Sequence, residues 1–174
     1  RLQEKLAKYK DALASYLMIL DINGDHADAL YDIAMHHYKM KNMKKAREYL
    51  EALLKKRPGI IDARYLFGKI LFEQGNYLLS NKQFELLEKH DQGNPEVYFY
   101  KARNLENLRQ YNSAVDAYHK YLKAIEKKGQ SPKESAIIHL AKLYIKLRQF
   151  KEATELIENR LGLLTEEKSR LELI

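Results

Sequence analysis

The sequence predicts an all-α fold built from consecutive antiparallel helix pairs, and two observations lead to this prediction. Small residues recur at a fixed interval, each followed four places later by a large side chain: Ala12, Ala46, Ser80 and Ala114 stand 34 residues apart, and Ala153 follows 39 residues later. Only 7 Gly and 3 Pro occur among 174 residues, so long regular segments with few turns are expected.

A second small residue stands twelve places before each of the last four and predicts the first helix of each pair. These residues are Ala34, Gly68, Ala102 and Ala141. Two helices of about 14 residues approach closely only where side-chain bulk is missing, and large neighbours then fill the remaining space. The predicted large core residues are Leu30, Leu50, Phe67, Phe84, Tyr118 and Ile157.

The same register predicts the domain organisation, a single array of helix pairs over residues 1–174. The full repeats are 27–60, 61–94, 95–133 and 134–167, preceded by a partial repeat at 1–26. Residues 168–174, in which Leu171 and Ile174 fit the packing pattern, begin a further repeat or a capping helix. Because both ends break off inside this pattern, our hypothesis is that the chain is a segment of a longer array.

Two Asn/Ser-Pro pairs predict helix starts. Asn94-Pro95 and Ser131-Pro132 each place a capping residue before a proline in the first helical position, and Ser131 with Glu134 fits a capping box. The five extra residues before the last repeat fall around residues 126–130 and predict a longer helix or loop there.

The large-small-x-x-large element, followed by a small-x-x-x-aromatic element, resembles the tetratricopeptide repeat family over essentially the whole chain. Pro58 stands where that family often closes a repeat. The resemblance implies a right-handed α-solenoid that acts as a scaffold for protein–protein interaction and binds its partner in the concave groove. Arg64 and Lys101 depart from the pattern, since a large apolar residue is usual there. We expect their stems to be buried and their charges hydrated.

In this family the first helices line the concave side, so the resemblance implies a ligand site there. Residues three and seven apart share one side of a helix. The resulting columns are acidic (Asp28, Asp62 and Glu96, ending in Ser135), aromatic (Tyr31, Tyr65, Phe99, Ile138), basic after its first member (Met35, Lys69, Arg103, Lys142) and mixed (Tyr38, Phe72, Glu106, Ile145). The predicted partner-binding residues are Tyr31, Met35, Tyr38, Tyr65, Lys69, Phe72, Phe99, Arg103, Ile138 and Lys142.

Such a groove suits a peptide or helix that carries apolar anchors and acidic groups. Aromatic rings supply contact area, and Lys69, Arg103 and Lys142 supply orientation and association rate. The net charge of +7 also favours acidic partners. The charge is spread along the chain without a block of five like charges, so nucleic acid is not the expected partner.

The sequence offers no pattern for catalysis or a cofactor. Cys is absent, which excludes disulfides, thiolate metal sites and a Cys nucleophile but leaves the compartment open. His36 and His37 are adjacent on a helix and cannot share one metal ion. The acidic run at 21–25 fits a turn between repeats better than a calcium loop. No phosphate-binding glycine loop, nucleophile elbow or apolar run of about 18 residues occurs. We therefore expect no enzyme activity, metal, cofactor or membrane span.

Three alternatives remain open. The chain could self-associate through apolar ends of the array and build a larger assembly. It could bind RNA, as related helical-pair repeats do, although no base-reading pattern is seen. It could also be the substrate-presenting part of a larger enzyme.

Overall fold

The computed structural model describes residues 2–159, and the side chains of residues 11–159. This part of the chain is helical and contains no strand. The helices are α1 (Leu2–Ile22), α2 (Ala27–Lys39), α3 (Met43–Lys56), α4 (Ile61–Glu73), α5 (Tyr77–His90), α6 (Pro95–Asn107), α7 (Tyr111–Lys127) and α8 (Glu134–Lys146), followed by helical residues 150–159. None of the described helices combines the length and hydrophobicity needed to cross a bilayer.

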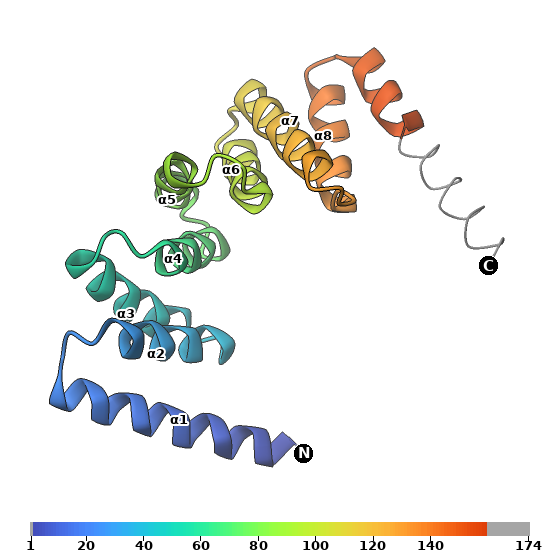
Figure 1. Cartoon of the computed structure of the whole chain (residues 1–174). Coiled ribbons are helices and arrows are strands. Elements are labelled where there is room, and N and C mark those ends of the chain that lie inside the picture. Colours follow the sequence, from blue (N-terminus) through green and yellow to red (C-terminus); the bar gives the residue numbers. More distant parts are fainter. Residues whose placement is uncertain (1, 160–174) are drawn as a thin grey trace. The chain divides into compact units, whose positions relative to one another are not determined.

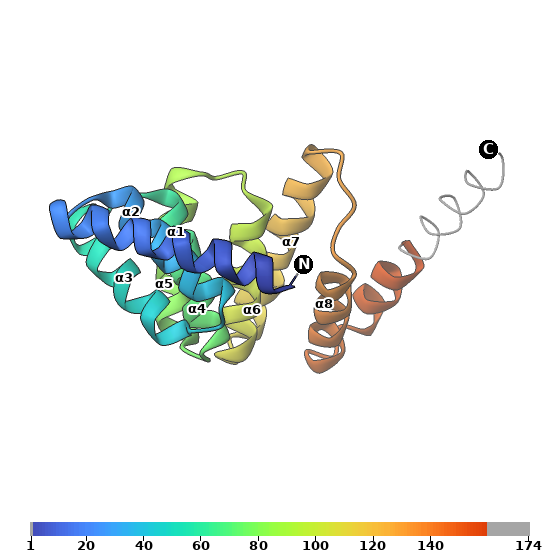
Figure 2. The same cartoon turned by 90° about the horizontal axis from the view of Figure 1, so that it is seen from below.

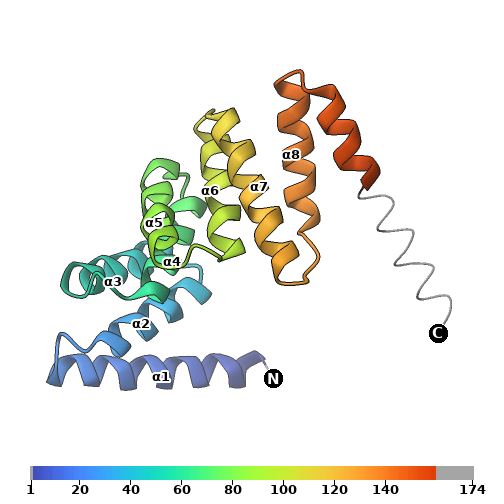
Figure 3. The same cartoon turned by 45° about the horizontal axis from the view of Figure 1, so that its top comes forward.

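The described residues form two compact units, which divide between Gln92 and Gly93. The first unit contains α1 to α5, and each helix packs against the next (Figure 1). Helices α1 and α2 lie side by side (Figure 2), and α2 also contacts α4. The second unit contains α6 to α8, of which α6 and α7 form the most extensive contact (Figure 3). These pairs confirm the predicted all-α solenoid fold class.

Helices α2, α4, α6 and α8 begin at residues 27, 61, 95 and 134, where the predicted repeats start. Within each pair the connecting turn has three residues, and its middle residue has a left-handed backbone: φ is 61° at Lys41, 76° at Gly75, 60° at Arg109 and 60° at Arg148. The assignment of whole repeats stays a prediction, because the proposed start of a further repeat at 168–174 lies outside the described residues.

Small residues hold the first unit together by letting two backbones approach. Gly68 on α4 faces the ring of Phe84 on α5, which is fully buried. A Cβ added at Gly68 would lie 2.9 Å from Cε2 of that ring. The Ser80 hydroxyl donates a 2.8 Å hydrogen bond to the Gly68 carbonyl. In the neighbouring pair, Ala34 and Ala46 are both fully buried. The predicted register of small residues is therefore confirmed here.

The second unit repeats this arrangement with an aromatic core. Ala102 and Ala114 are fully buried, as are the side chains of Tyr118 and Tyr121. Helix α7 has 17 residues, whereas α3 and α5 each have 14. The extra residues before the last repeat thus lengthen α7 and leave a loop at residues 128–133.

Of the two predicted capped helix starts, one is confirmed and one is wrong. Asn94 caps α6 by accepting a hydrogen bond from the Glu96 N–H, and Pro95 follows in the first turn. Ser131 does not cap α8, because that helix begins only at Glu134 and its N-cap residue is Lys133. The backbone N–H of Lys133 donates instead to the Tyr121 hydroxyl, 2.7 Å away. A tertiary contact has replaced the local capping box.

The predicted large core residues divide in a similar way. Leu30, Leu50, Phe84 and Tyr118 are buried, and Phe67 is half-buried. Ile157 is 43% exposed and does not belong to the described core. Arg64 is half-buried, and its guanidinium donates to the Gln83 Oε1, 2.8 Å away, and to the Pro58 carbonyl. Its charged end is thus held by polar atoms, which differs from the hydrated charge we expected.

Candidate functional site

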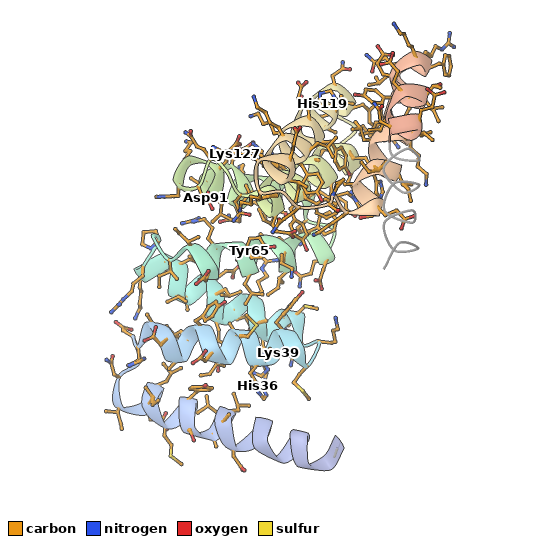
Figure 4. All side chains as sticks on the ribbon, turned by 45° about the vertical axis from the view of Figure 1, so that its right-hand side comes forward. His36, Lys39, Tyr65, Asp91, His119 and Lys127 are labelled. Carbon is orange, nitrogen blue, oxygen red and sulfur yellow. The ribbon has the colours of Figure 1, made fainter. Side chains whose placement is uncertain are left out.

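In the first unit, three predicted site residues from two helices meet in one cluster, which we call the aromatic–lysine cluster: Tyr38 on α2, with Tyr65 and Lys69 on α4. The Lys69 Nζ lies 5.5 Å from the centroid of the Tyr38 ring and 5.8 Å from that of Tyr65, labelled in Figure 4. These distances allow cation–π attraction. All three side chains are half-buried, so each keeps some surface for a partner.

Tyr38 fixes the position of this cluster. Its hydroxyl donates a 2.6 Å hydrogen bond to the Glu73 carboxylate at the end of α4. The Lys41 Nζ lies 6.0 Å from the centroid of the same ring. The hydrogen bond at its hydroxyl and the two lysines beside it define the position of the Tyr38 ring between α2 and α4.

The other predicted residues of this unit pack against its buried core or against α5. Tyr31 and Met35 are half-buried and pack against the core of the α2–α4 layer. Burial, together with the nearby carboxylates of Asp62 and Asp32, raises the pKa of the Tyr31 hydroxyl. The Phe72 ring makes an edge contact with Tyr77, with centroids 5.6 Å apart.

The predicted residues of the second unit have different surroundings. Phe99 is only 8% exposed, and its ring packs against Tyr121 and beneath the Lys133 Nζ, 4.4 Å from the ring centroid. Phe99 therefore contributes mainly to the core of this unit. Ile138 is 44% exposed, and Lys142 is exposed on the same helix. The continuity of the predicted columns from one unit to the other stays a prediction.

Glu106 is the centre of a polar network in the second unit. One of its carboxylate oxygens lies 3.0 Å from the His139 Nδ1. The other accepts from the Tyr118 hydroxyl at 3.4 Å and lies 3.7 Å from the Arg103 Nε. Burial is the main cause of the raised pKa of Tyr118, so its hydroxyl keeps its proton and acts as a donor.

A pocket with a volume of about 380 Å³ lies beside Glu106, where the ends of α6 and α8 meet the start of α7. Its lining residues are Glu106, Asn107, Arg109, Tyr111, Lys142, Leu143 and Lys146. Only Lys142 was among the predicted site residues. Two signals were available for the others: Lys146 follows Lys142 by one helical turn, and Arg109 takes the turn position at which the preceding repeat has Gly75.

Histidines in the described part of the chain do not form a metal site, and no group of three or more His, Asp or Glu residues there could hold an ion. His37 is half-buried rather than fully packed in the core, and its ring stacks on Tyr49 with centroids 5.8 Å apart. Burial lowers the pKa of His37, and the neighbouring His36 and Lys45 lower it further. His37 is thus a structural histidine that favours its neutral form.

Residues 5–70, which include most of the aromatic–lysine cluster's two helices, match the model of the tetratricopeptide repeat family. This match confirms the predicted tetratricopeptide repeat resemblance for residues 5–70. No curated protein matches it.

Solved structures share this tetratricopeptide fold. A crystal structure of MamA is 14% identical, with a TM-score of 0.83 over 96% of this chain and 95% of that chain. A MamA fragment from residue 41 to the end, from Desulfovibrio magneticus RS-1, is 17% identical, with a TM-score of 0.81 over 94% of this chain and 91% of that one. At these identities the similarity establishes the tetratricopeptide fold and nothing about the ligand.

Proposed function

We propose that this chain is a protein-interaction scaffold whose first helices bind a peptide or helix of a partner protein within a larger assembly. The aromatic–lysine cluster of Tyr38, Tyr65 and Lys69 carries this proposal. It is assembled from α2 and α4, which are first helices of successive repeats and contact each other. In tetratricopeptide arrays such helices supply the inner surface.

The physical properties of the cluster suit a binding surface. Half-exposed tyrosine rings offer large contact area at low entropic cost, and such rings are enriched among residues that dominate binding energy. The Lys69 charge beside the rings favours an acidic group next to an apolar anchor on the partner. The net charge of +7 extends that preference to longer range.

The test is capture of partners from the native cell extract on the wild-type chain and on Lys69→Glu/Arg103→Glu, with the bound proteins identified by mass spectrometry. A matched control, Lys44→Glu/Lys123→Glu, makes the same change in net charge at exposed positions of the second helices α3 and α7. Circular dichroism first establishes that the wild type and both variants are folded.

The proposal predicts a protein that the wild type and the control retain and that Lys69→Glu/Arg103→Glu loses. A partner held equally by all three would move the site to the outer helices, the loops or the ends of the array. A partner lost from both variants would reflect net charge rather than this surface.

Self-association is a second candidate function, and the exposed face of α1 favours it. Met18 is 65% exposed and Ile22 is 88% exposed. Ile19 is 36% exposed, whereas Leu53, 34 residues later in the same register, is 1% exposed. Sedimentation equilibrium should then give a mass that rises with concentration, and Met18→Lys/Ile22→Lys should restore the monomer. A constant monomer mass for the wild type would exclude this candidate.

A further inference from the structure

The pocket of about 380 Å³ in the second unit carries a charge imbalance. Three residues with cationic side chains line it: Arg109 from the α6–α7 turn, and Lys142 and Lys146 from α8. Glu106 is the only acidic residue in its lining. One carboxylate cannot neutralise three cations, and the Glu106 carboxylate also lies 3.7 Å from the Arg103 Nε outside the lining. Charges of one sign around a partly enclosed cavity raise the local concentration of the opposite ion.

Arg109 lines this pocket from a turn in which its backbone is left-handed. Its φ is 60°, in the left-handed region that glycine enters without strain. The preceding repeat has Gly75 at the same turn position, with φ 76°. Lys41 and Arg148 take the same turn position in two other repeats, with φ 61° and 60°, so the left-handed backbone belongs to the turn rather than to the pocket. In this repeat the turn places Arg109 in the pocket lining, where it adds a third basic residue to Lys142 and Lys146.

At the equivalent positions of the first unit, the chain itself provides an acidic side chain, Glu73. Counting back through the repeats, Lys142 corresponds to Lys69 and Lys146 corresponds to Glu73. In the first unit the Glu73 carboxylate accepts from the Tyr38 hydroxyl, close to Lys69. In the second unit a lysine takes the position of that carboxylate, and its Nζ lies 4.2 Å from the centroid of the Tyr111 ring. Both units thus have a lysine at the first of these two positions, but α8 has a lysine where α4 has a carboxylate.

We propose that this pocket binds the carboxylate of an acidic side chain from a partner protein. Arg109, Lys142 and Lys146 surround the carboxylate, while Tyr111 and Leu143 contact its methylene stem or an adjacent apolar residue. A planar carboxylate matches the two parallel N–H groups of one arginine. A phosphate dianion suits the pocket less well, because the Glu106 carboxylate in its wall repels the second charge. The protein source of this carboxylate rests on the proposed function, whereas carboxylate binding itself does not.

The experiment uses the whole chain, residues 1–174, labelled with ¹⁵N, and follows its amide spectrum during titration with N-acetyl-glutamyl-leucine amide. The control ligand is N-acetyl-glutaminyl-leucine amide, which has the same shape without the charge. A separate titration with inorganic phosphate compares the two anions. The variants are Lys146→Glu, which restores the acid that the first unit has at this position, and Lys123→Glu, which changes net charge equally. Lys123 lies on α7 roughly 18 Å along the helix from Tyr111, well away from the pocket.

We expect saturable shifts of the Tyr111 and Leu143 amides with the glutamyl ligand in the millimolar range, and none with the glutaminyl ligand. Lys146→Glu should weaken binding by about fivefold or more, and Lys123→Glu by less than about twofold, since exposed pairs are individually weak. Equal shifts with both ligands, equal weakening by both variants, or tighter binding of phosphate at the same amides would overturn the proposal. The titration uses no protein partner. If the pocket binds the glutamyl ligand but no partner is captured, only the proposed function is contradicted. A captured partner without carboxylate binding would fail only this inference.

Discussion

Substituting Gly68 by alanine tests the packing of α4 on α5 most sharply, because two effects of known sign oppose each other. Alanine favours a helix over glycine by about 1 kcal/mol. The new Cβ would, however, lie 2.9 Å from Cε2 and 3.0 Å from Cζ of the Phe84 ring, which is fully buried and cannot swing into solvent. Overpacking of this kind costs about 1–3 kcal/mol. The net change should therefore be a destabilisation of about 0–2 kcal/mol.

A double-mutant cycle separates the two effects. Phe84→Ala alone should cost about 3–5 kcal/mol, as expected for removal of a fully buried ring. In that background the clash is gone, so Gly68→Ala should stabilise the chain by about 1 kcal/mol. The cycle thus predicts a coupling energy of about 1–3 kcal/mol between the two positions.

The assay is urea unfolding followed by far-ultraviolet circular dichroism, with amide hydrogen exchange to locate the change in α4 and α5, since repeat proteins can unfold in parts. Ala52→Gly at an exposed position of α3 supplies the propensity reference within the same unit. If Gly68→Ala stabilised by the same amount in both backgrounds, the ring would not lie against the glycine and the packing argument would be refuted.

Three further predictions concern single residues. Ser80→Ala should cost about 0.5–1.5 kcal/mol in urea unfolding, because it removes the hydrogen bond to the Gly68 carbonyl but keeps the small volume; no loss at all would show that this bond contributes nothing. Burial, His36 and Lys45 lower the pKa of His37 below its ordinary 6.5, and Glu48 opposes them. Because the unfolded state therefore binds the proton at higher pH than the folded state, the unfolding free energy falls as pH drops below about 6.5. His37→Phe should reduce the difference in melting temperature between pH 7.5 and pH 5.5, and an unchanged difference would assign the titration to other groups. Arg109→Gly should raise stability by about 1 kcal/mol by relieving the left-handed backbone, and a lower melting temperature would show that the arginine's contacts outweigh the strain.

Much of the fold could be predicted from the sequence, because close helix packing imposes a strict rule on side-chain volume. Gly68 and Ala46 had to be small, and the 34-residue interval between such positions predicted where each helix begins. The predicted Ser131 capping box was wrong. A capping pattern considers only hydrogen bonds between residues near in sequence, whereas the Lys133 N–H donates to Tyr121, a residue of the preceding helix. Local motifs fail where a buried polar group offers a better partner.

The candidate site was less predictable, since register fixes which side of a helix a residue occupies but not how deeply its neighbours bury it. Tyr65 and Lys69 kept accessible surface, whereas Phe99 in the same column as Tyr65 was enclosed by Tyr121 and Lys133. Arg109 and the pocket could not be seen from columns of first-helix residues, because a turn residue contributes to it. Its left-handed backbone becomes visible only in the structure.

The central claim is that the aromatic–lysine cluster binds a partner protein, and its most direct test is an isothermal titration of the captured partner into four chains. These are the wild type, Tyr65→Ala, Lys69→Glu and the outer-helix control Lys44→Glu. The account predicts that Tyr65→Ala and Lys69→Glu each weaken the affinity about tenfold or more, as for residues central to an interface, while Lys44→Glu stays within about twofold of the wild type. Equal affinities for all four chains, each folded by circular dichroism, would contradict it.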